Sequence, residues 1–482
     1  MKKWNIFELK LNGKTGGDPF TDNKIFGEFS NENETKTVSG FYDGDGIYRI
    51  RFMPSFEGKY SYRIFGSFSD EVCTGRFNVS GAAGHGPVRA AGKTIEYADG
   101  TPYYSVGTTC YVWTCQTRAL REQTLNTLKN SSFNKLRFCI FPKHYDYNFR
   151  DPVMFPYEGT PVDNSGIDKF SFSEYKPDND GNNWDFSRFN TEYFKIIDEC
   201  VETLTELGIE ADIILFHPYD RWGFSKMPRW ADDLYLKYVI ARYSAYPNVW
   251  WSLANEYDLC RYKTDDDWEH YAQVVTECDP YGHMLSVHNC VKLYDFSKEW
   301  VTHCSIQRQT GDKELDFIPS WLEKYNKPVV IDEMCYEDNI EQDWGNISGE
   351  EMLRRMWKVY ILGGHPGHSE CYFGDDIWWS HGGRLYGESH KRFGFLHKIM
   401  TECGNLHTVG YLTSENDDGS IKLRYFGEHR PSFITMKLGD ERFRIEVIDT
   451  WNMTVEDRGV FSGNVKIDMP QRCYMAVRMT KE

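Results

Sequence analysis

Two apolar runs in the chain end directly in carboxylates. The run VWWSLA is followed by Asn255 and Glu256, and the run PVVI is followed by Asp332 and Glu333. A general acid must reach the oxygen of a glycosidic bond, and an amide beside it can hold a sugar 2-hydroxyl, a contact that strengthens in the transition state. Successive strand residues point to opposite faces, so only one of Asp332 and Glu333 can enter a cleft shared with Glu256. The residue types therefore indicate paired-carboxylate chemistry on a sugar.

The elements that must position these acids are short apolar runs that alternate with helix-like segments from about residue 88 to residue 400. The runs predicted as strands are Tyr103–Gly107, Lys135–Ile140, Glu210–Phe216, Val249–Leu253, Met284–Val287, Val301–Ile306, Pro328–Ile331 and Ser369–Phe373. This alternation is typical of βα units around a parallel sheet. A doubly wound open sheet would give the same alternation. Polar residues directly after so many runs favour a closed barrel, because a barrel's active site forms at the carboxyl ends of its strands.

Both ends of the chain have the pattern of short alternating strands. Two Asp-Gly pairs at 43–46 precede an alternating run at 47–52, and the last 80 or so residues return to short strands parted by turns. A glycine- and alanine-rich stretch before Pro87 resembles a linker. We therefore predict an α/β fold: an N-terminal Ig-like β-sandwich over 1–85, a catalytic (β/α)₈ TIM barrel over 86–400 and a C-terminal β-sandwich over 401–482.

Composition narrows the class of partner. The net charge of −17 is spread along the chain, which disfavours nucleic acid or an anionic membrane. The 15 Trp, 31 Tyr and 31 Phe suit a protein that binds carbohydrate, although large aromatics also fill cores. We find no apolar stretch long enough to span a membrane and no signal-peptide pattern at the start. Thirteen cysteines without a C-x-x-C pair are typical of reduced thiols, so we expect a cytoplasmic protein.

Counting strands places Glu256 at the end of the fourth and Glu333 at the end of the seventh. This arrangement resembles the clan A glycoside hydrolases, whose acid/base follows an Asn at the end of strand four and whose nucleophile ends strand seven. The resemblance implies that Glu256 is the general acid/base, that Glu333 is the nucleophile, and that Arg137 on strand two lies near them. A cation there would keep Glu333 ionised while Glu256 stays protonated. The alternative for Arg137 is a structural salt bridge.

Over nearly its full length the chain resembles the apiosidase-like glycoside hydrolases, which carry one β-sandwich before the barrel and another after it. The motifs that match are Gly40–Gly46 with Arg51–Pro54, Phe141–Lys143, Asn255–Asp258 and Val447–Trp451. The resemblance implies the domain architecture but does not identify the substrate. Activities on one fold differ with the loops, so apiose does not follow from the family name.

Further residues that follow the predicted strands are candidate sugar contacts. The predicted substrate-binding residues are Asn255, Arg137, His217, His288, Gln307, Tyr372, Trp378 and Trp379. Two choices stay open: Gln307 or Gln309 on strand six, and Trp378 or Trp379 near strand eight. His217 could instead be held by backbone hydrogen bonds alone. Residues 143–145 follow strand two and could also reach the substrate.

The sequence predicts neither a metal nor another cofactor. His365 and His368 are three positions apart, but the Pro-Gly between them removes the geometry of a helical ligand pair. The glycine-rich stretches match neither a P-loop nor a dinucleotide-binding fingerprint.

We therefore expect a retaining glycoside hydrolase that works by double displacement, with the two carboxyl groups about 5–5.5 Å apart. A long insertion from about residue 148 to 184 would wall the cleft and favour exo action on a small glycoside or oligosaccharide. Two alternatives remain. A transglycosidase would use the same residues, and a catalytically silent carbohydrate-binding protein would retain the aromatic surfaces, although the presence of both acids and the arginine argues against it. The flanking sandwiches could bind carbohydrate, but the more common role is to buttress the barrel or make contacts in a homo-oligomer.

Overall fold

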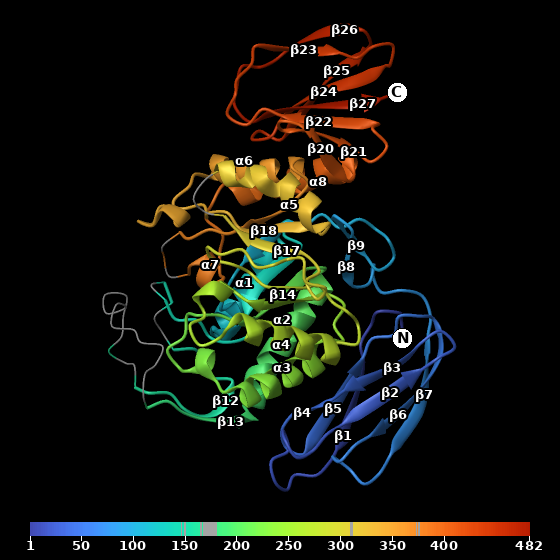
Figure 1. Cartoon of the computed structure of the whole chain (residues 1–482), viewed down its shortest axis with the longest axis vertical. Coiled ribbons are helices and arrows are strands. Elements are labelled where there is room, and N and C mark those ends of the chain that lie inside the picture. The colour runs from blue at the N-terminus through green and yellow to red at the C-terminus, as the bar shows by residue number, and fades with distance from the viewer. Residues whose placement is uncertain are drawn as a thin grey trace.

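The computed structural model describes residues 1–145, 147–148, 151–163, 166, 181–308, 312–372, 374 and 376–482. A central barrel lies between N-terminal sheets at one end of the long axis and C-terminal sheets at the other (Figure 1). None of the described helices has the length and apolar character needed to cross a membrane.

Eight parallel strands form the barrel. They are β10 (Gly107–Thr109), β11 (Lys135–Cys139), β14 (Glu210–Phe216), β15 (Val249–Ala254), β16 (Leu285–Ser286), β17 (Cys304–Gln307), β18 (Val329–Glu333) and β19 (His365–His368). Their order is β16-β15-β14-β11-β10-β19-β18-β17, and a parallel bridge between His288 and Ser305 joins the two ends of this order. The predicted (β/α)₈ barrel is therefore confirmed.

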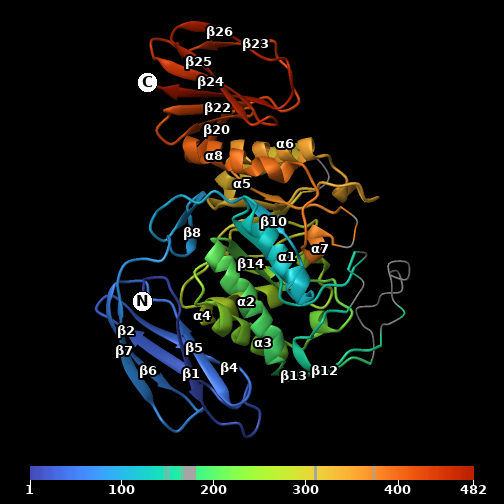
Figure 2. The ribbon, with the colours of Figure 1, turned by 180° about the vertical axis from the view of Figure 1, so that it is seen from behind.

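The barrel helices lie outside the strands, as the views from the front and from behind show (Figures 1 and 2). They are α1 (Arg118–Lys129), α2 (Thr191–Leu207), α3 (Arg229–Tyr243), α4 (Asp265–Cys278), α5 (Ile318–Tyr325), α6 (Gly349–Ile361), α7 (Trp378–His381) and α8 (Phe393–Cys403). Short 3₁₀ turns include η4 (Tyr257–Leu259) and η7 (Ser389–Arg392). An antiparallel ribbon of β12 (Tyr157–Thr160) and β13 (Asn183–Phe189) precedes α2.

Helix α2 illustrates how the local sequence sets these elements. The Asn190 side chain caps its first turn by accepting a hydrogen bond from the Glu192 amide at 3.2 Å, and Gly208 ends it with a φ of 71°. Tyr193, Phe194, Ile197, Cys200, Val201 and Leu204 are buried. This apolar face packs α2 against the barrel.

The bounds of the first and last barrel strands differ from those predicted. Strand one is Gly107–Thr109 rather than Tyr103–Gly107, and strand eight is His365–His368 rather than Ser369–Phe373, of which Phe373 lies outside the described residues. The Pro-Gly pair in strand eight has the pattern of a turn, but the adjacent strand requires it. A Cβ at Gly367 would lie 2.4 Å from the carbonyl oxygen of Asp332, so only glycine allows this backbone approach.

The N-terminal region contains two antiparallel sheets. One comprises β1 (Phe7–Asn12), β5 (Ile47–Phe52) and β4 (Phe41–Tyr42), and the other β3 (Thr35–Ser39), β2 (Phe26–Ser30), β6 (Gly58–Phe65) and β7 (Cys73–Val79). Phe29 and Phe52 stack between them with ring centroids 4.2 Å apart. A hairpin of β8 (Val88–Ala91) and β9 (Thr94–Tyr97) leads to the barrel (Figure 1).

The C-terminal region is a six-stranded antiparallel sheet with a further strand pair. The sheet comprises β20 (Leu406–Gly410), β21 (Thr413–Asn416), β22 (Ile421–Tyr425), β27 (Met475–Lys481), β24 (Phe443–Asp449) and β25 (Thr454–Phe461). The pair is β23 (Phe433–Lys437) and β26 (Asn464–Asp468). Helices α6 and α8 lie between the barrel and this sheet (Figure 1), and Trp357 stacks on Tyr425 there at 5.6 Å.

A buried ionic cluster joins the N-terminal sheets to the barrel helices. Arg51 Nη2 lies 2.8 Å from Asp198 Oδ2, and Arg242 Nε lies 2.7 Å from the other oxygen of Asp198. Arg242 Nη2 also reaches Asp43 Oδ1 at 2.8 Å. Burial alone would raise the pKa of Asp198, but Arg51 and Arg242 outweigh it and hold the pKa below its usual value. Asp198 therefore stays charged between two arginines that are themselves buried.

We predict that Asp198→Asn lowers the free energy of unfolding by about 3–5 kcal/mol, because it leaves two buried guanidinium groups without their shared carboxylate. The loss should shrink as the pH falls below about 4, since a group with a depressed pKa stabilises the fold only while it is ionised. Urea denaturation at several pH values measures both effects.

Asp70→Asn is the matched control, because Asp70 forms an ion pair with Lys14 but its side chain is 89% exposed. It should cost less than about 1 kcal/mol. Equal stability of the two variants would contradict the role given to Asp198.

Candidate active site

A pocket of about 310 Å³ lies at the carboxyl ends of the barrel strands. It is lined by Tyr111, Lys143, Tyr145, Tyr147, Tyr219, Glu256, Cys290, Gln307, Glu333, Tyr336, Trp344 and Trp379. Glu256 follows β15, and Glu333 is the last residue of β18. The barrel thus brings two acids 77 positions apart in sequence into one cavity, at the end where barrel sites form.

Glu333 is surrounded by hydrogen-bond donors and a cation. Its Oε1 lies 3.4 Å from Arg137 Nη1 and accepts a hydrogen bond from the Tyr111 hydroxyl. His288 Nε2 lies 3.8 Å from the same oxygen. Burial, with Arg137 adding to it, lowers the pKa of His288 to about 3, so the imidazole is neutral at physiological pH. One oxygen of Glu333 is therefore held by a guanidinium and a phenolic hydroxyl, with a neutral imidazole nearby.

Asn255 connects the two glutamates. Arg137 Nη1 donates to Asn255 Oδ1 at 2.7 Å, and Asn255 Nδ2 donates to Glu256 Oε2 at 3.1 Å. The Tyr111 hydroxyl also lies 3.1 Å from Asn255 Oδ1. Asn255 is fully buried, so these contacts fix its amide.

Glu256 adopts an unusual backbone conformation. Its φ is 51°, in the left-handed region that a residue with a side chain rarely occupies. Directly after it, the Tyr257 amide donates to the His288 carbonyl at 2.9 Å, which ties this turn to the next strand end. Backbone strain of this kind is found where the surrounding structure holds a side chain in a functional position. Here the Glu256 side chain lines the pocket.

The neighbouring acid, Asp332, belongs to a different cluster. Lys135 Nζ lies 2.6 Å from Asp212 and 2.7 Å from Asp332, and Ser305 Oγ donates to Asp332 at 2.6 Å. Burial alone would raise the pKa of Asp332, but Lys135 and Arg137 outweigh it and hold the pKa well below its usual value. Asp332 therefore supports the barrel interior, whereas Glu333 faces the pocket.

Lys143 places a buried ammonium among aromatic rings at the pocket. Its Nζ lies 3.4, 4.2 and 4.6 Å from the ring centroids of Tyr111, Tyr219 and Tyr145. Burial lowers its pKa. Cation–π contacts offset part of the desolvation of a buried lysine, and the ammonium keeps donors that can point into the cavity.

One side of the pocket is aromatic. Trp379 contacts Trp344, Tyr336 and Tyr147, with ring centroids 4.9, 5.7 and 5.9 Å away. Packed rings of this kind hold one another in place. The wall therefore has a fixed shape against which a flat face of a ligand can lie.

The predicted substrate contacts fall into two groups. The first group lies at the pocket: Gln307 and Trp379 line it, and Asn255, Arg137 and His288 contact its two glutamates or one another. The others contact different parts of the protein: His217 the Phe141 carbonyl at 3.3 Å, Tyr372 the Glu337 carboxylate at 3.5 Å and Trp378 the Thr108 hydroxyl at 2.8 Å. Of the two tryptophans, Trp379 is the one at the pocket. Gln309 lies outside the described residues.

Several residues of the pocket were not predicted as substrate contacts from the sequence. They are Tyr111, Tyr147, Tyr219, Cys290, Tyr336 and Trp344. Tyr111 follows β10, which ends at Thr109; the sequence pattern predicts the strand end two residues earlier, at Gly107, and therefore does not point to Tyr111. Tyr219 lies two residues after His217. His217 is the first polar residue after the predicted strand Glu210–Phe216, so the sequence points to it and not to Tyr219.

Among the described residues, the side chains close enough together to hold a metal ion are Glu337, His368 and Glu370. They are not part of the pocket lining. The pocket itself therefore presents carboxylates, an ammonium, hydroxyl groups and aromatic rings, a set that suits acid–base chemistry on a polar ligand with flat apolar faces.

Three family models match separate parts of the chain. The model described as "Apiosidase-like, catalytic domain" matches residues 89–401. Two domains of unknown function, DUF5060 and DUF5605, match residues 1–66 and 411–480. The first match alone covers more than half of the chain.

Among solved structures, a "putative glycoside hydrolase" from Bacteroides vulgatus is 34% identical, with a TM-score of 0.91 over 100% of this chain and 99% of that one. A glycoside hydrolase family 5 protein from the same organism is 15% identical, with a TM-score of 0.61 over 82% of this chain and 94% of that one, which is a likeness of fold alone. A search among curated proteins gave no match. The family model and the full-length relative together show that the chain belongs to the apiosidase-like glycoside hydrolases.

Proposed function

We propose that the protein is a retaining glycosidase in which Glu333 is the nucleophile and Glu256 the general acid/base. The observation that carries this proposal is the position of both glutamates in one pocket, with Arg137 3.4 Å from Glu333. Glu333 attacks the anomeric carbon while Glu256 gives its proton to the leaving oxygen. Glu256 then takes a proton from water, which attacks the glycosyl-enzyme and releases the sugar with retained configuration. The separation of about 5–5.5 Å between the carboxyl groups stays a prediction.

The unequal roles of the acids follow from their neighbours. Arg137 and the Tyr111 hydroxyl both contact the same oxygen of Glu333. Glu256 instead accepts a hydrogen bond from the Asn255 amide, and the Tyr219 hydroxyl lies beside it. Two carboxyl groups in one cleft can take different roles when their neighbours differ in this way.

The dimensions of the pocket support exo action. A volume of about 310 Å³ is at the lower end of the range for small-molecule sites, and the aromatic wall of Trp379, Trp344 and Tyr336 closes one side. We propose that it accepts one terminal sugar of a small glycoside or oligosaccharide. The family name makes pentofuranosides, apiosides included, a first class to assay beside hexopyranosides.

A transglycosidase would use the same residues and pass the glycosyl group to a sugar hydroxyl instead of water. We further propose that 1–85, 86–400 and 401–482 are separate folding units, which the breaks between the three family matches support. A cytoplasmic location is our proposal from the 13 cysteines, nine of which are buried thiols.

Glu256→Gln should reduce kcat by about 10²–10⁴-fold on a substrate with a poor leaving group, because the leaving oxygen is no longer protonated. The loss should be smaller on an aryl glycoside whose phenolate leaves unaided. Glu333→Gln should abolish turnover of both kinds of substrate. Steady-state kinetics on the two substrates distinguish the roles.

Glu323→Gln serves as the control, since the Glu323 side chain is 81% exposed and pairs with Lys93. It should retain full activity. If either pocket variant hydrolysed both substrates as fast as this control, the assignment would be wrong.

Tyr111→Phe should lower kcat/KM. The variant removes the hydroxyl that donates to Glu333 and contacts Asn255, so both side chains lose a contact that holds them in position. Tyr147→Phe is the matched control: it lines the same pocket, but its hydroxyl bonds to Gln342. A kcat/KM of Tyr111→Phe equal to that of this control would speak against the hydrogen bond as a determinant of the nucleophile.

Lys143→Met should reduce kcat/KM by about 10- to 150-fold, since it removes a charged donor while keeping an apolar stem among the tyrosine rings. The thermal midpoint should not fall, because the variant also removes a buried charge. A variant with normal kcat/KM would show that Lys143 makes no contact with the substrate.

A further inference from the structure

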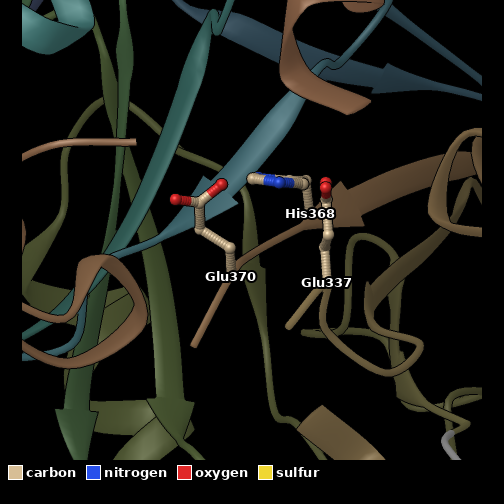
Figure 3. Close-up of side chains that lie close together, drawn as sticks. All are labelled: Glu337, His368 and Glu370. Atoms are coloured by element: carbon tan, nitrogen blue, oxygen red, sulfur yellow. The ribbon is translucent and has the colours of Figure 1, made fainter. Parts of the chain in front are cut away.

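A second group of buried polar side chains lies behind the aromatic wall of the pocket. His368 ends β19, Glu370 follows two residues later, and Glu337 follows β18. One ligand-capable atom of each lies within 4.8 Å of the other two, and all three residues are at most 1% exposed. Figure 3 shows the imidazole of His368 between the two carboxylates, with an oxygen of Glu370 directed toward the outer end of the ring.

The imidazole has an unused nitrogen. His368 Nδ1 lies 3.2 Å from Thr108 Oγ1, whereas Nε2 has no hydrogen-bond partner among the described residues although His368 is fully buried. A buried nitrogen without a partner costs free energy. If Nδ1 donates its proton to Thr108, the lone pair of Nε2 is available to a ligand, which is how metal-binding histidines are oriented by a second contact.

The two carboxylates are held in place by the backbone. Glu370 accepts from the amides of Tyr386 and Gly387 at 2.5 and 2.9 Å, and Glu337 accepts from those of Glu388 and Ser389 at 2.6 and 3.0 Å. Glu337 Oε1 also lies 3.5 Å from the Tyr372 hydroxyl, and the other three oxygens can still accept from a second direction. The segment 386–389 therefore fixes both acids in position and leaves capacity for another partner.

Three carboxyl groups lie close together here. Asp338, next to Glu337, is 9% exposed, and neither of its carboxylate oxygens has a hydrogen-bond partner within the described parts of the chain. No lysine or arginine of those parts lies within ion-pair distance of Glu337, Asp338 or Glu370. Buried carboxylates that lie together need a cation or bound protons.

We propose that Glu337, His368 and Glu370 bind a divalent transition-metal ion that holds the aromatic wall of the active site. One imidazole nitrogen with carboxylate oxygens suits Zn²⁺ or Mn²⁺, whereas Ca²⁺ takes six to eight oxygen ligands. The site reaches the wall through the backbone, since the Trp379 amide donates to the Glu370 carbonyl at 3.0 Å and Tyr336 precedes Glu337. The ion positions the wall and touches no substrate, so its binding can be measured without any assay of activity.

The full-length protein, stripped with a chelator, is titrated with Zn²⁺ or Mn²⁺ alone, and with Ca²⁺ as a hard-cation comparison. Metal retained after gel filtration is quantified by mass spectrometry, and the thermal midpoint is recorded. We expect retention of one Zn²⁺ or Mn²⁺ per chain with a higher midpoint, and no stoichiometric retention of Ca²⁺. A wild-type protein that retains none of these ions, with an unchanged midpoint, would overturn the proposal. Protons shared among the buried carboxyl groups would then neutralise them.

Variants locate the ion. His368→Gln and Glu370→Gln should lose retention, and Thr108→Val should weaken affinity by about 10- to 100-fold through the lost orientation of His368. His407→Gln, which removes an exposed histidine beside Glu415, should bind like the wild type. Circular dichroism confirms that each variant is folded. Stoichiometric retention in folded His368→Gln and Glu370→Gln would place the ion elsewhere and contradict the assignment.

Discussion

The contact of Arg137 with both Glu333 and Asn255 is the constraint on which the active site depends. Arg137 is buried on strand β11, and its acceptors lie at the ends of β15 and β18, with Asp212 of β14 4.0 Å from its Nε. Asn255, which accepts from Arg137, donates from its amide to Glu256. One arginine therefore contacts Glu333 directly and Glu256 through Asn255, so the two acids have unequal environments.

Charge compensation recurs through the protein at different depths. Below the pocket, Lys135 is shared by Asp212 and Asp332, and at the N-terminal interface Asp198 is shared by two arginines. Asp212 and Asp332 are buried and Asp198 is partly buried, each beside its partner. Glu337 and Glu370 differ from these carboxylates, because their oxygens accept from backbone amides and, for Glu337, from the Tyr372 hydroxyl at 3.5 Å, and not from a lysine or arginine of the described residues. Buried Asp220 is likewise held by backbone amides, so what sets Glu337 and Glu370 apart is that two carboxyl groups lie together beside a histidine nitrogen without a hydrogen-bond partner in the described parts of the chain.

Much of this organisation could be predicted from the sequence. The apolar runs that end in Glu256 and Glu333, and the alternation of strands and helices, indicate the barrel and the two acids, because burial and strand period leave strong patterns. Strand eight could not be predicted in this way, because its Pro-Gly pair has the pattern of a turn. The glycine is required by the close approach of β18, which only the tertiary structure creates. The same holds for Tyr111, which becomes a neighbour of Glu333 only after the barrel closes.

The anomeric configuration of the first product tests the account most directly. Proton NMR recorded during hydrolysis, before mutarotation, distinguishes the two outcomes on any glycoside that the enzyme accepts. A glycosyl-enzyme formed on Glu333 and released by water with Glu256 as base predicts that the first sugar has the configuration of the substrate. Initial release of the opposite anomer would show a single displacement by water and would contradict Glu333 as the nucleophile.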